Sequence, residues 1–323
     1  MDLRTGILEK ITPPPHMIYG GFKLSPNGEH LAFWKSNLDA DGKSVDLWLV
    51  VENADGKVMV EVPGNLQIWD TYYWLDNERV VIGLYGDPYV LNPFTSDDYG
   101  LGKWYSQSPG GIKTIPVWNV NGIFDSQLSR IFYIQEDGTM LLWDLTQKQI
   151  LTKFTPPGKF DPVGQPKWNR DDSKIFLAFT PFDSKNTGDE FFSITRNGQV
   201  TQLTQLWKHY SNVVISNFSL SPDGSRIAFY FSDVNDKDNS EQFAILDLQT
   251  HKVINYCNLS GFALTAAEPV WSPDGKMLLI ENLEADSKTY NTILVDITKE
   301  FAGKLIENLI PVGWMNVHQS LPE

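Results

Sequence analysis

Three oxygen-bearing side chains at alternate positions are the clearest candidates for metal chemistry in this sequence. Asn37, Asp39 and Asp41 precede Gly42, and oxygen ligands with this spacing before a glycine are typical of calcium-binding loops. The glutamate that usually closes such a loop is missing, because Trp48 stands at the twelfth position. Two interpretations stay open, a calcium site or a solvated hairpin loop, and the sequence indicates no other cofactor.

The residues needed for covalent catalysis are not arranged for it. The Gly-x-Ser-x-Gly pentapeptide of serine hydrolases is missing, and its nearest match, GKSVD at residues 42–46, lacks the second glycine. None of the five histidines has the i, i+4 spacing of a helical zinc site. The single cysteine, Cys257, excludes an internal disulfide and a cysteine metal cluster. We therefore predict a protein without enzymatic activity.

Aromatic residues gather in three segments between the expected strands. Residues 84–105 form an unusually long connection, and such connections in compact domains are often functional. Residues 67–73 and 206–212 add further Trp and Tyr side chains, the types most enriched at binding hot spots. These aromatic residues either pack together as a small core or present a recognition surface. The predicted binding residues are Trp69, Tyr72, Tyr73, Tyr85, Tyr89, Phe94, Tyr99, Trp104, Trp207 and Tyr210.

A recurring four-residue turn indicates which elements position these segments. SPDG occupies residues 221–224 and 272–275, and SPNG occupies residues 25–28. Proline presets the second turn position, Asp or Asn suits the third, and Gly takes the left-handed position that returns the chain as a hairpin. Three degraded copies complete a series at intervals of 44 to 52 residues. The six turns begin at Ser25, Leu75, Asp125, Asn169, Ser221 and Ser272.

Each repeat unit of about 50 residues carries four short strands separated by turn residues, which predicts an all-β fold. An isolated four-stranded unit would leave its apolar faces wet, so neighbouring units must stack. We predict a six-bladed β-propeller of four-stranded antiparallel blades in a single domain, residues 1–323. The predicted blades begin near residues 17, 67, 116, 164, 213 and 265, with an N-terminal arm or closure strand at 1–16 and a C-terminal closure strand and tail at 310–323. A seven-bladed propeller with an incomplete last blade is the alternative.

Tryptophans stand at equivalent places in this repeat. Trp74, Trp168 and Trp271 each directly precede a hairpin turn, and we interpret them as packing between blades rather than as ligand contacts. The string IPVGW at residues 310–314 resembles EPVW at residues 268–271. The chain is therefore expected to begin another inner strand near its C-terminus.

The negative charge of the protein is concentrated in the loops that join second and third strands. Residues 36–46, 84–102, 135–138, 180–190, 232–241 and 282–290 contain 17 acids and 4 bases, against a net charge of −14 for the whole chain. This concentration either aids solubility or attracts a basic partner. The excess of acids opposes nucleic-acid binding.

The turn motif and the strand after it also resemble a known family. LSPDGSRIAFY at residues 220–230, echoed by LSPNGEHLAFW and WSPDGKMLLI, is similar to the repeat of TolB-like (WD-repeat-like) propellers and of the propeller domains of prolyl-oligopeptidase-type peptidases. The resemblance covers nearly the whole chain, but only three of the six copies keep the full motif. It implies a binding component outside the bacterial cytoplasm, in the periplasm or cell envelope. The given chain shows neither a signal peptide nor a stretch long enough for membrane insertion.

These observations predict a non-enzymatic scaffold that binds a protein or peptide, with basic partners favoured, on an acidic and aromatic face. Two alternatives stay open. One is a substrate-recognition or lid module for a hydrolase on another chain, and the other is a carbohydrate-binding propeller.

Overall fold

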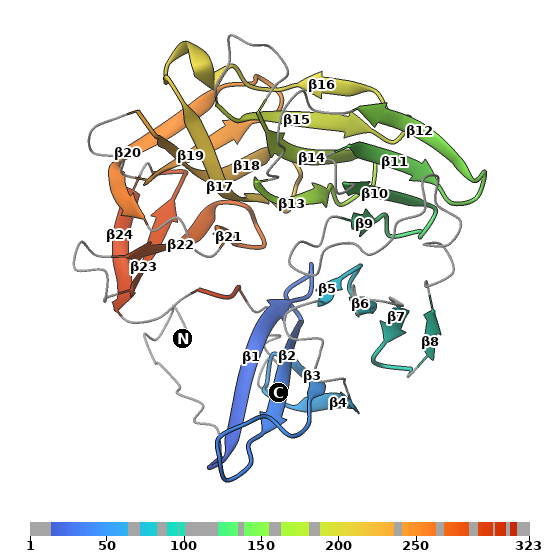
Figure 1. Cartoon of the computed structure of the whole chain (residues 1–323). Coiled ribbons are helices and arrows are strands. Elements are labelled where there is room, and N and C mark those ends of the chain that lie inside the picture. The colour runs from blue at the N-terminus through green and yellow to red at the C-terminus, as the bar shows by residue number, and fades with distance from the viewer. Residues whose placement is uncertain are drawn as a thin grey trace, which may run out of the picture. The chain divides into compact units, whose positions relative to one another are not determined.

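The predicted fold class is confirmed: the protein is an all-β, six-bladed propeller of four-stranded antiparallel sheets (Figure 1). The structure is a computed structural model. It describes residues 14–63, 72–82, 89–95, 97–100, 122–134, 139–154, 163–180, 188–235, 241–262, 268–283, 290–299, 301–307 and 311–314. In this part of the chain no helix has the length and hydropathy that a membrane span requires.

In every blade the four strands pair in the order of the sequence. The first three blades comprise β1 (Met17–Leu24), β2 (His30–Asn37), β3 (Trp48–Asn53) and β4 (Val58–Pro63); β5 (Tyr72–Trp74), β6 (Val80–Ile82), β7 (Tyr89–Asn92) and β8 (Asp97–Gly100); and β9 (Gly122–Phe124), β10 (Arg130–Ile134), β11 (Met140–Asp144) and β12 (Gln149–Phe154). The last three comprise β13 (Val163–Trp168), β14 (Lys174–Phe179), β15 (Glu190–Thr195) and β16 (Val200–Gln202); β17 (Val213–Leu220), β18 (Arg226–Asp233), β19 (Glu241–Asp247) and β20 (Val253–Phe262); and β21 (Val270–Trp271), β22 (Met277–Leu283), β23 (Tyr290–Asp296) and β24 (Phe301–Glu307).

One expectation about the second blade is wrong. Residues 84–105 were expected to form a single long connection, but β7 and β8 lie within them and supply the third and fourth strands of the blade. The pattern was hard to recognise because these strands are only four residues each, and Asp97 and Asp98 within β8 resemble loop residues. The acids of β8 therefore belong to an outer strand.

The strands form two compact units. The first contains β1 to β8, and the second contains β9 to β24. Within the second unit the first strands of successive blades contact one another, β9 with β13, β13 with β17 and β17 with β21. Within the first unit β1 contacts β5.

The turn motif works through the side chain of its first residue. In blades 1, 5 and 6 the hydroxyl of Ser25, Ser221 or Ser272 accepts a hydrogen bond from the backbone N–H five residues later, at 2.9–3.0 Å. In blades 3 and 4 a carboxylate or amide oxygen, from Asp125 or Asn169, accepts the same bond at 2.8 and 2.9 Å. Two of the three degraded copies therefore keep the acceptor at the first turn position.

The fourth turn residue has a left-handed backbone in all five of these blades. Gly28, Gly224 and Gly275 have φ values of 66–72°, whereas Leu128 and Asp172 occupy the same place with φ 54°. A non-glycine residue pays a steric penalty for this conformation. Blades 3 and 4 thus form the same turn under backbone strain.

The hydrophobic core lies between blades. One cluster joins Phe176 and Phe191 of blade 4 to Phe218 and Phe229 of blade 5, and other clusters join blades 1 and 2, blades 3 and 4, and blades 5 and 6. Within each unit the successive β-sheets bury apolar faces against one another, as the stacking argument requires.

The predicted inter-blade tryptophans are confirmed by their hydrogen bonds. Trp74, Trp168 and Trp271 each donate the indole N–H to a backbone carbonyl on the first strand of the preceding blade, at 3.0–3.4 Å. Trp314 makes the equivalent bond to Val270 of β21 at 3.0 Å. These side chains are therefore part of the fold.

Candidate binding surface

A short segment between blades 4 and 5, residues 205–212, presents an exposed tryptophan on a firmly held backbone. Leu206–Lys208 forms a 3-10 helix, in which Leu206 is buried in the core and Trp207 is 43% exposed. Gln205, Lys208 and His209 are also exposed. The Lys208 ammonium lies 5.7 Å from the centre of the Trp207 ring, within range of a cation–π contact.

The buried carboxylate of Glu190 fixes the start of this segment. Glu190 begins β15 and is fully buried, and its Oε1 accepts the backbone N–H of Trp207 at 3.0 Å. The other oxygen accepts the hydroxyl of Thr204, whose Oγ1 in turn accepts the N–H of Phe191 at 2.9 Å. Both oxygens of Glu190 are therefore bonded, to Thr204 and to the backbone of Trp207, so the backbone under Trp207 is well anchored.

The carboxylate of Asp233, at the end of β18, fixes the end of the segment. It accepts the backbone N–H groups of Ser211 and Asn212 at 2.8 and 3.0 Å, and the Ser211 hydroxyl. Partial burial alone would raise the pKa of Asp233, but these bonds and one from Asn235 outweigh that effect and hold the pKa below its usual value. The ionised form is therefore the one that holds the loop.

Tyr210 ties the middle of the segment to blade 5. Its ring packs edge-on against Phe231 with centroids 5.0 Å apart, and its hydroxyl accepts a hydrogen bond from Asn255 Nδ2 at 3.0 Å. The predicted residue Tyr210 is thus half-buried and mainly supports the segment, whereas the predicted residue Trp207 is available to a partner.

The predicted aromatic residues of blade 2 divide by burial. Tyr72 is fully buried and packs edge-on against Trp34, and its hydroxyl donates to the carbonyl of Gly21, so its prediction as an exposed contact is wrong. Tyr73 is half-buried on β5, and Phe94 is 37% exposed with its ring 4.7 Å from that of His30. The side chain of Tyr72 on the short strand β5 faces the core, and the sequence pattern alone did not reveal this.

Other predicted residues of the aromatic set are placed only in part. Tyr89 lies on β7 and Tyr99 on the neighbouring β8. Trp69, Tyr85 and Trp104 lie outside the described residues. The predicted set is also divided between the two units, because Trp207 and Tyr210 belong to the second.

The predicted calcium loop is held together by its own hydrogen bonds. Asp39 Oδ1 accepts the backbone N–H groups of Asp41 and Lys43, both at 2.9 Å, and the Asn37 amide donates to Asp46 at 2.7 Å. Among the described residues, no group of three or more His, Cys, Asp or Glu side chains is placed to hold a metal ion. The solvated-turn interpretation accounts for each of these contacts.

Three acids of the predicted acidic face are buried. Asp189, Glu190 and Glu241 were assigned to exposed loops, but they are 5%, 0% and 2% exposed. Their position directly before or at the start of a third strand was the signal that could have revealed this, since the strands they begin are buried along most of their length. A basic partner therefore has less support from the structure than from the sequence.

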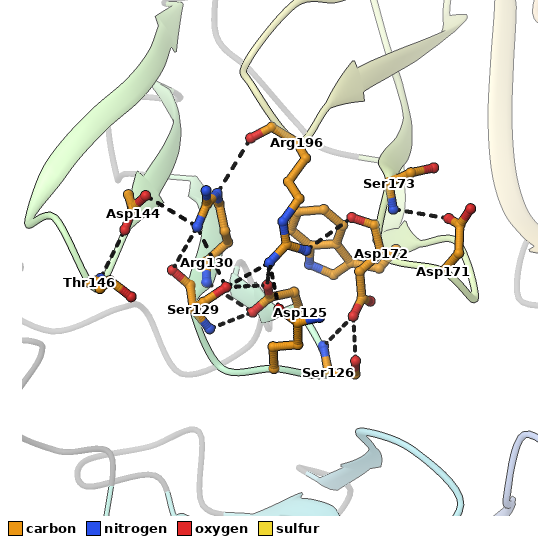
Figure 2. A network of polar contacts seen from close by, with 12 residues as sticks. Asp125, Ser126, Ser129, Arg130, Asp144, Thr146, Asp171, Asp172, Ser173 and Arg196 are labelled. Carbon is orange, nitrogen blue, oxygen red and sulfur yellow. Dashed lines mark hydrogen bonds and ion pairs between the residues drawn. The ribbon is translucent and has the colours of Figure 1, made fainter.

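A second polar cluster joins the hairpin turns of blades 3 and 4 (Figure 2). Arg196 binds the buried carboxylate of Asp125 at 2.5 Å and the carbonyl of Asp172 at 3.2 Å, and Asp172 accepts the backbone N–H of Ser126 at 2.9 Å. Although Asp, Ser and Arg occur together here, these bonds connect one turn to the next. We assign the cluster to the fold.

Comparison with known proteins gives a likeness of fold only. No protein-family model matches the chain, and no curated protein sequence is significantly similar to it. Among solved structures, TolB from Acinetobacter baumannii aligns with 88% of this chain at 17% identity and a TM-score of 0.49. The β-propeller domain of Cps50 (Swd1) from Myceliophteria thermophila aligns with 85% of this chain and 95% of its own length, at 10% identity and a TM-score of 0.47. The aligned region spans 62% of the TolB chain.

Proposed function

We propose that this protein is a non-enzymatic binding scaffold that captures a protein or peptide through residues 205–212. The observation that carries the proposal is the exposed indole of Trp207 on a backbone anchored by the buried carboxylate of Glu190. A large aromatic side chain on a rigid support binds with little loss of conformational entropy, and tryptophan is the residue type most enriched at binding hot spots.

The non-enzymatic part of the proposal is supported by the sequence, which lacks the nucleophile pentapeptide of serine hydrolases. A location outside the cytoplasm is supported only by the resemblance of the turn motif to TolB-like propellers. Both statements are parts of the proposal. The propeller fold hosts many unrelated functions, so it is compatible with a binding scaffold.

Selection of a random peptide library on the immobilised protein tests the proposal. We expect recovered peptides to lose about 30-fold in affinity with Trp207→Ala, the effect of a hot-spot residue. Phe22→Ala is the matched control, because Phe22 is 40% exposed and lies in the other unit. Peptides that bind both variants equally would contradict the role of Trp207. Binding to a glycan array that depends on Trp207 would favour the carbohydrate-binding alternative.

A further inference from the structure

One buried carboxylic acid in the second unit is only half satisfied. Glu241 begins β19 and is 2% exposed. Its Oε1 accepts the hydroxyl of Ser216 from β17, whereas its Oε2 has no hydrogen-bond partner in the described structure. Burying an oxygen without a hydrogen-bond partner lowers the stability of the folded state, and the effect is far larger when the oxygen carries charge. Burial raises the pKa of Glu241 to about 7, although the Ser216 bond acts in the opposite direction.

The neighbouring strands present acidic rather than basic groups to Glu241. Tyr230 on β18 is fully buried, and its hydroxyl accepts the backbone N–H of Glu281 on β22 at 3.3 Å. Burial raises the pKa of Tyr230, and the negative charges of Glu241 and Glu281 raise it further, so the three groups form one electrostatic cluster. Of the other charged groups on β18, Arg226 lies over the Trp271 ring and Asp233 binds Ser211.

The remaining strands around β19 add little charge. The sequence of β17 contains no titratable residue, β20 carries Tyr256 and Cys257, and β23 carries Tyr290 and Asp296. Asp296 binds Lys299 and Thr298 at the far end of its strand. Loss of a proton from Glu241 therefore places a negative charge near the buried Tyr230 hydroxyl, with no cation among these groups to balance it.

Two hydrogen bonds lead from the residue after this acid to the candidate binding surface. Gln242 follows Glu241 directly, and its Oε1 accepts Asn255 Nδ2 at 2.6 Å. The same Nδ2 donates to the hydroxyl of Tyr210 at 3.0 Å. Glu241 is thus connected through the adjacent Gln242 and then Asn255 to Tyr210, the residue that ties segment 205–212 to blade 5.

Blade 4 supplies a matched position in which the acid is fully satisfied. The pairs Phe179–Glu190 and Phe231–Gln242 occupy the same register, so Asp189 and Glu241 are equivalent. Asp189 Oδ1 accepts the Thr180 hydroxyl at 2.9 Å, and Oδ2 accepts the backbone N–H of Ile215 at 3.0 Å. The unfilled oxygen is a property of Glu241 and not of the repeat position.

We propose that Glu241 is a proton-binding site that couples the pH of the medium to the order of residues 205–212. The neutral acid is compatible with the packed start of β19. The ionised acid is stabilised when this end of the strand opens to water, and opening displaces Gln242, Asn255 and Tyr210 in turn. The proposal concerns regulation of the surface assigned under the proposed function, but the coupling itself requires no ligand.

NMR of the tryptophan indole N–H groups tests the coupling directly, with the Trp207 signal assigned by Trp207→Phe. We expect this signal in the wild type to shift with a midpoint near pH 7, because burial raises the pKa of Glu241 to about 7. The shift should disappear in Glu241→Gln and persist in Asp189→Asn. A Trp207 signal that does not titrate, or one that titrates unchanged in Glu241→Gln, would overturn the proposal.

A stability measurement keeps the proposal testable if the signal is broadened. The pKa of Glu241 is higher in the folded than in the unfolded chain, so its contribution to stability is lost as pH rises from about 4.5 to about 7. Relative to Glu241→Gln, the unfolding equilibrium constant of the wild type should rise by up to about 300-fold over this range. Ser216→Ala, which removes the one bond to the carboxylate, should move the midpoint upward. Parallel pH profiles for wild type and Glu241→Gln would exclude the proton site.

Neither measurement uses a peptide. A failed peptide selection with a titrating Trp207 signal would reject only the proposed function, and the reverse result would reject only the pH coupling.

Discussion

Trp314 donates its indole N–H to the carbonyl of Val270 at 3.0 Å. Trp271 makes the equivalent bond to the carbonyl of Ser219 at 3.3 Å. The chain beyond blade 6 therefore repeats the contact by which one blade attaches to the blade before it. The similarity of residues 310–314 to residues 268–271 is explained by this shared bond.

Removing this bond should weaken the attachment of the last segment to blade 6. We expect Trp314→Phe to lower the free energy of unfolding by about 1 kcal/mol, because one hydrogen bond is lost while most of the ring is kept. Urea denaturation measures the effect. Trp271→Phe should cost a similar amount, and an effect of Trp271→Phe without one of Trp314→Phe would show that the final segment does not contribute to stability.

Arg196 should be important for stability although it takes no part in the candidate binding surface. Arg196→Met leaves the buried carboxylate of Asp125 without its cation, and breaking a buried pair in this way typically costs about 3 kcal/mol or more. Hydrogen bonds from Ser129 and Arg130 remain, so we expect about 2–3 kcal/mol in thermal or urea unfolding. Lys276→Met is the control, since its ion pair with Asp274 is exposed and should contribute less than about 0.5 kcal/mol. Equal effects of the two changes would contradict the assignment.

The strained turn of blade 3 offers a stabilising change. Leu128→Gly should raise the free energy of unfolding by up to about 1 kcal/mol, because glycine adopts the left-handed backbone without a steric penalty. Gly224→Ala tests the converse, since a Cβ there meets no atom within 4 Å and only the φ of 68° opposes it. We expect a loss of about 1 kcal/mol. A neutral result for Gly224→Ala would mean that the turn relaxes.

Close packing between blades 4 and 5 makes Gly188 intolerant of any side chain. A Cβ at Gly188 would lie 2.3 Å from the backbone nitrogen of Val213, and Asp189 N donates to the Val213 carbonyl at 2.7 Å. We expect Gly188→Ala to cost about 3 kcal/mol and to shift residues 205–212. Gly20→Ala is the control, since a Cβ there has open space. Melting temperatures that fall equally in the two variants would argue against the inter-blade clash.

The candidate binding surface was only partly predictable from sequence. Trp207 was recognised by its residue type and by its place between blades. The role of Glu190 was missed, because its bond to the Trp207 backbone spans 17 residues and its neighbours in sequence made it look like a loop acid. The burial of Tyr72 was missed because β5 has only three residues, too few for an alternating pattern to show which face is covered.

The sequence by itself determined the hairpins, their period and therefore the propeller fold. A turn depends on the conformational preferences of four adjacent residues and, in five of the six blades, on an acceptor at the first of them. This information is local, and Asp125 and Asn169 supply in their blades the acceptor that Ser25 supplies in blade 1. The tertiary structure alone decided which acids are buried and what they bind. Asp189 and Glu241 occupy the same place in the repeat, yet only Asp189 is fully bonded, because its partners include a backbone N–H of the following blade.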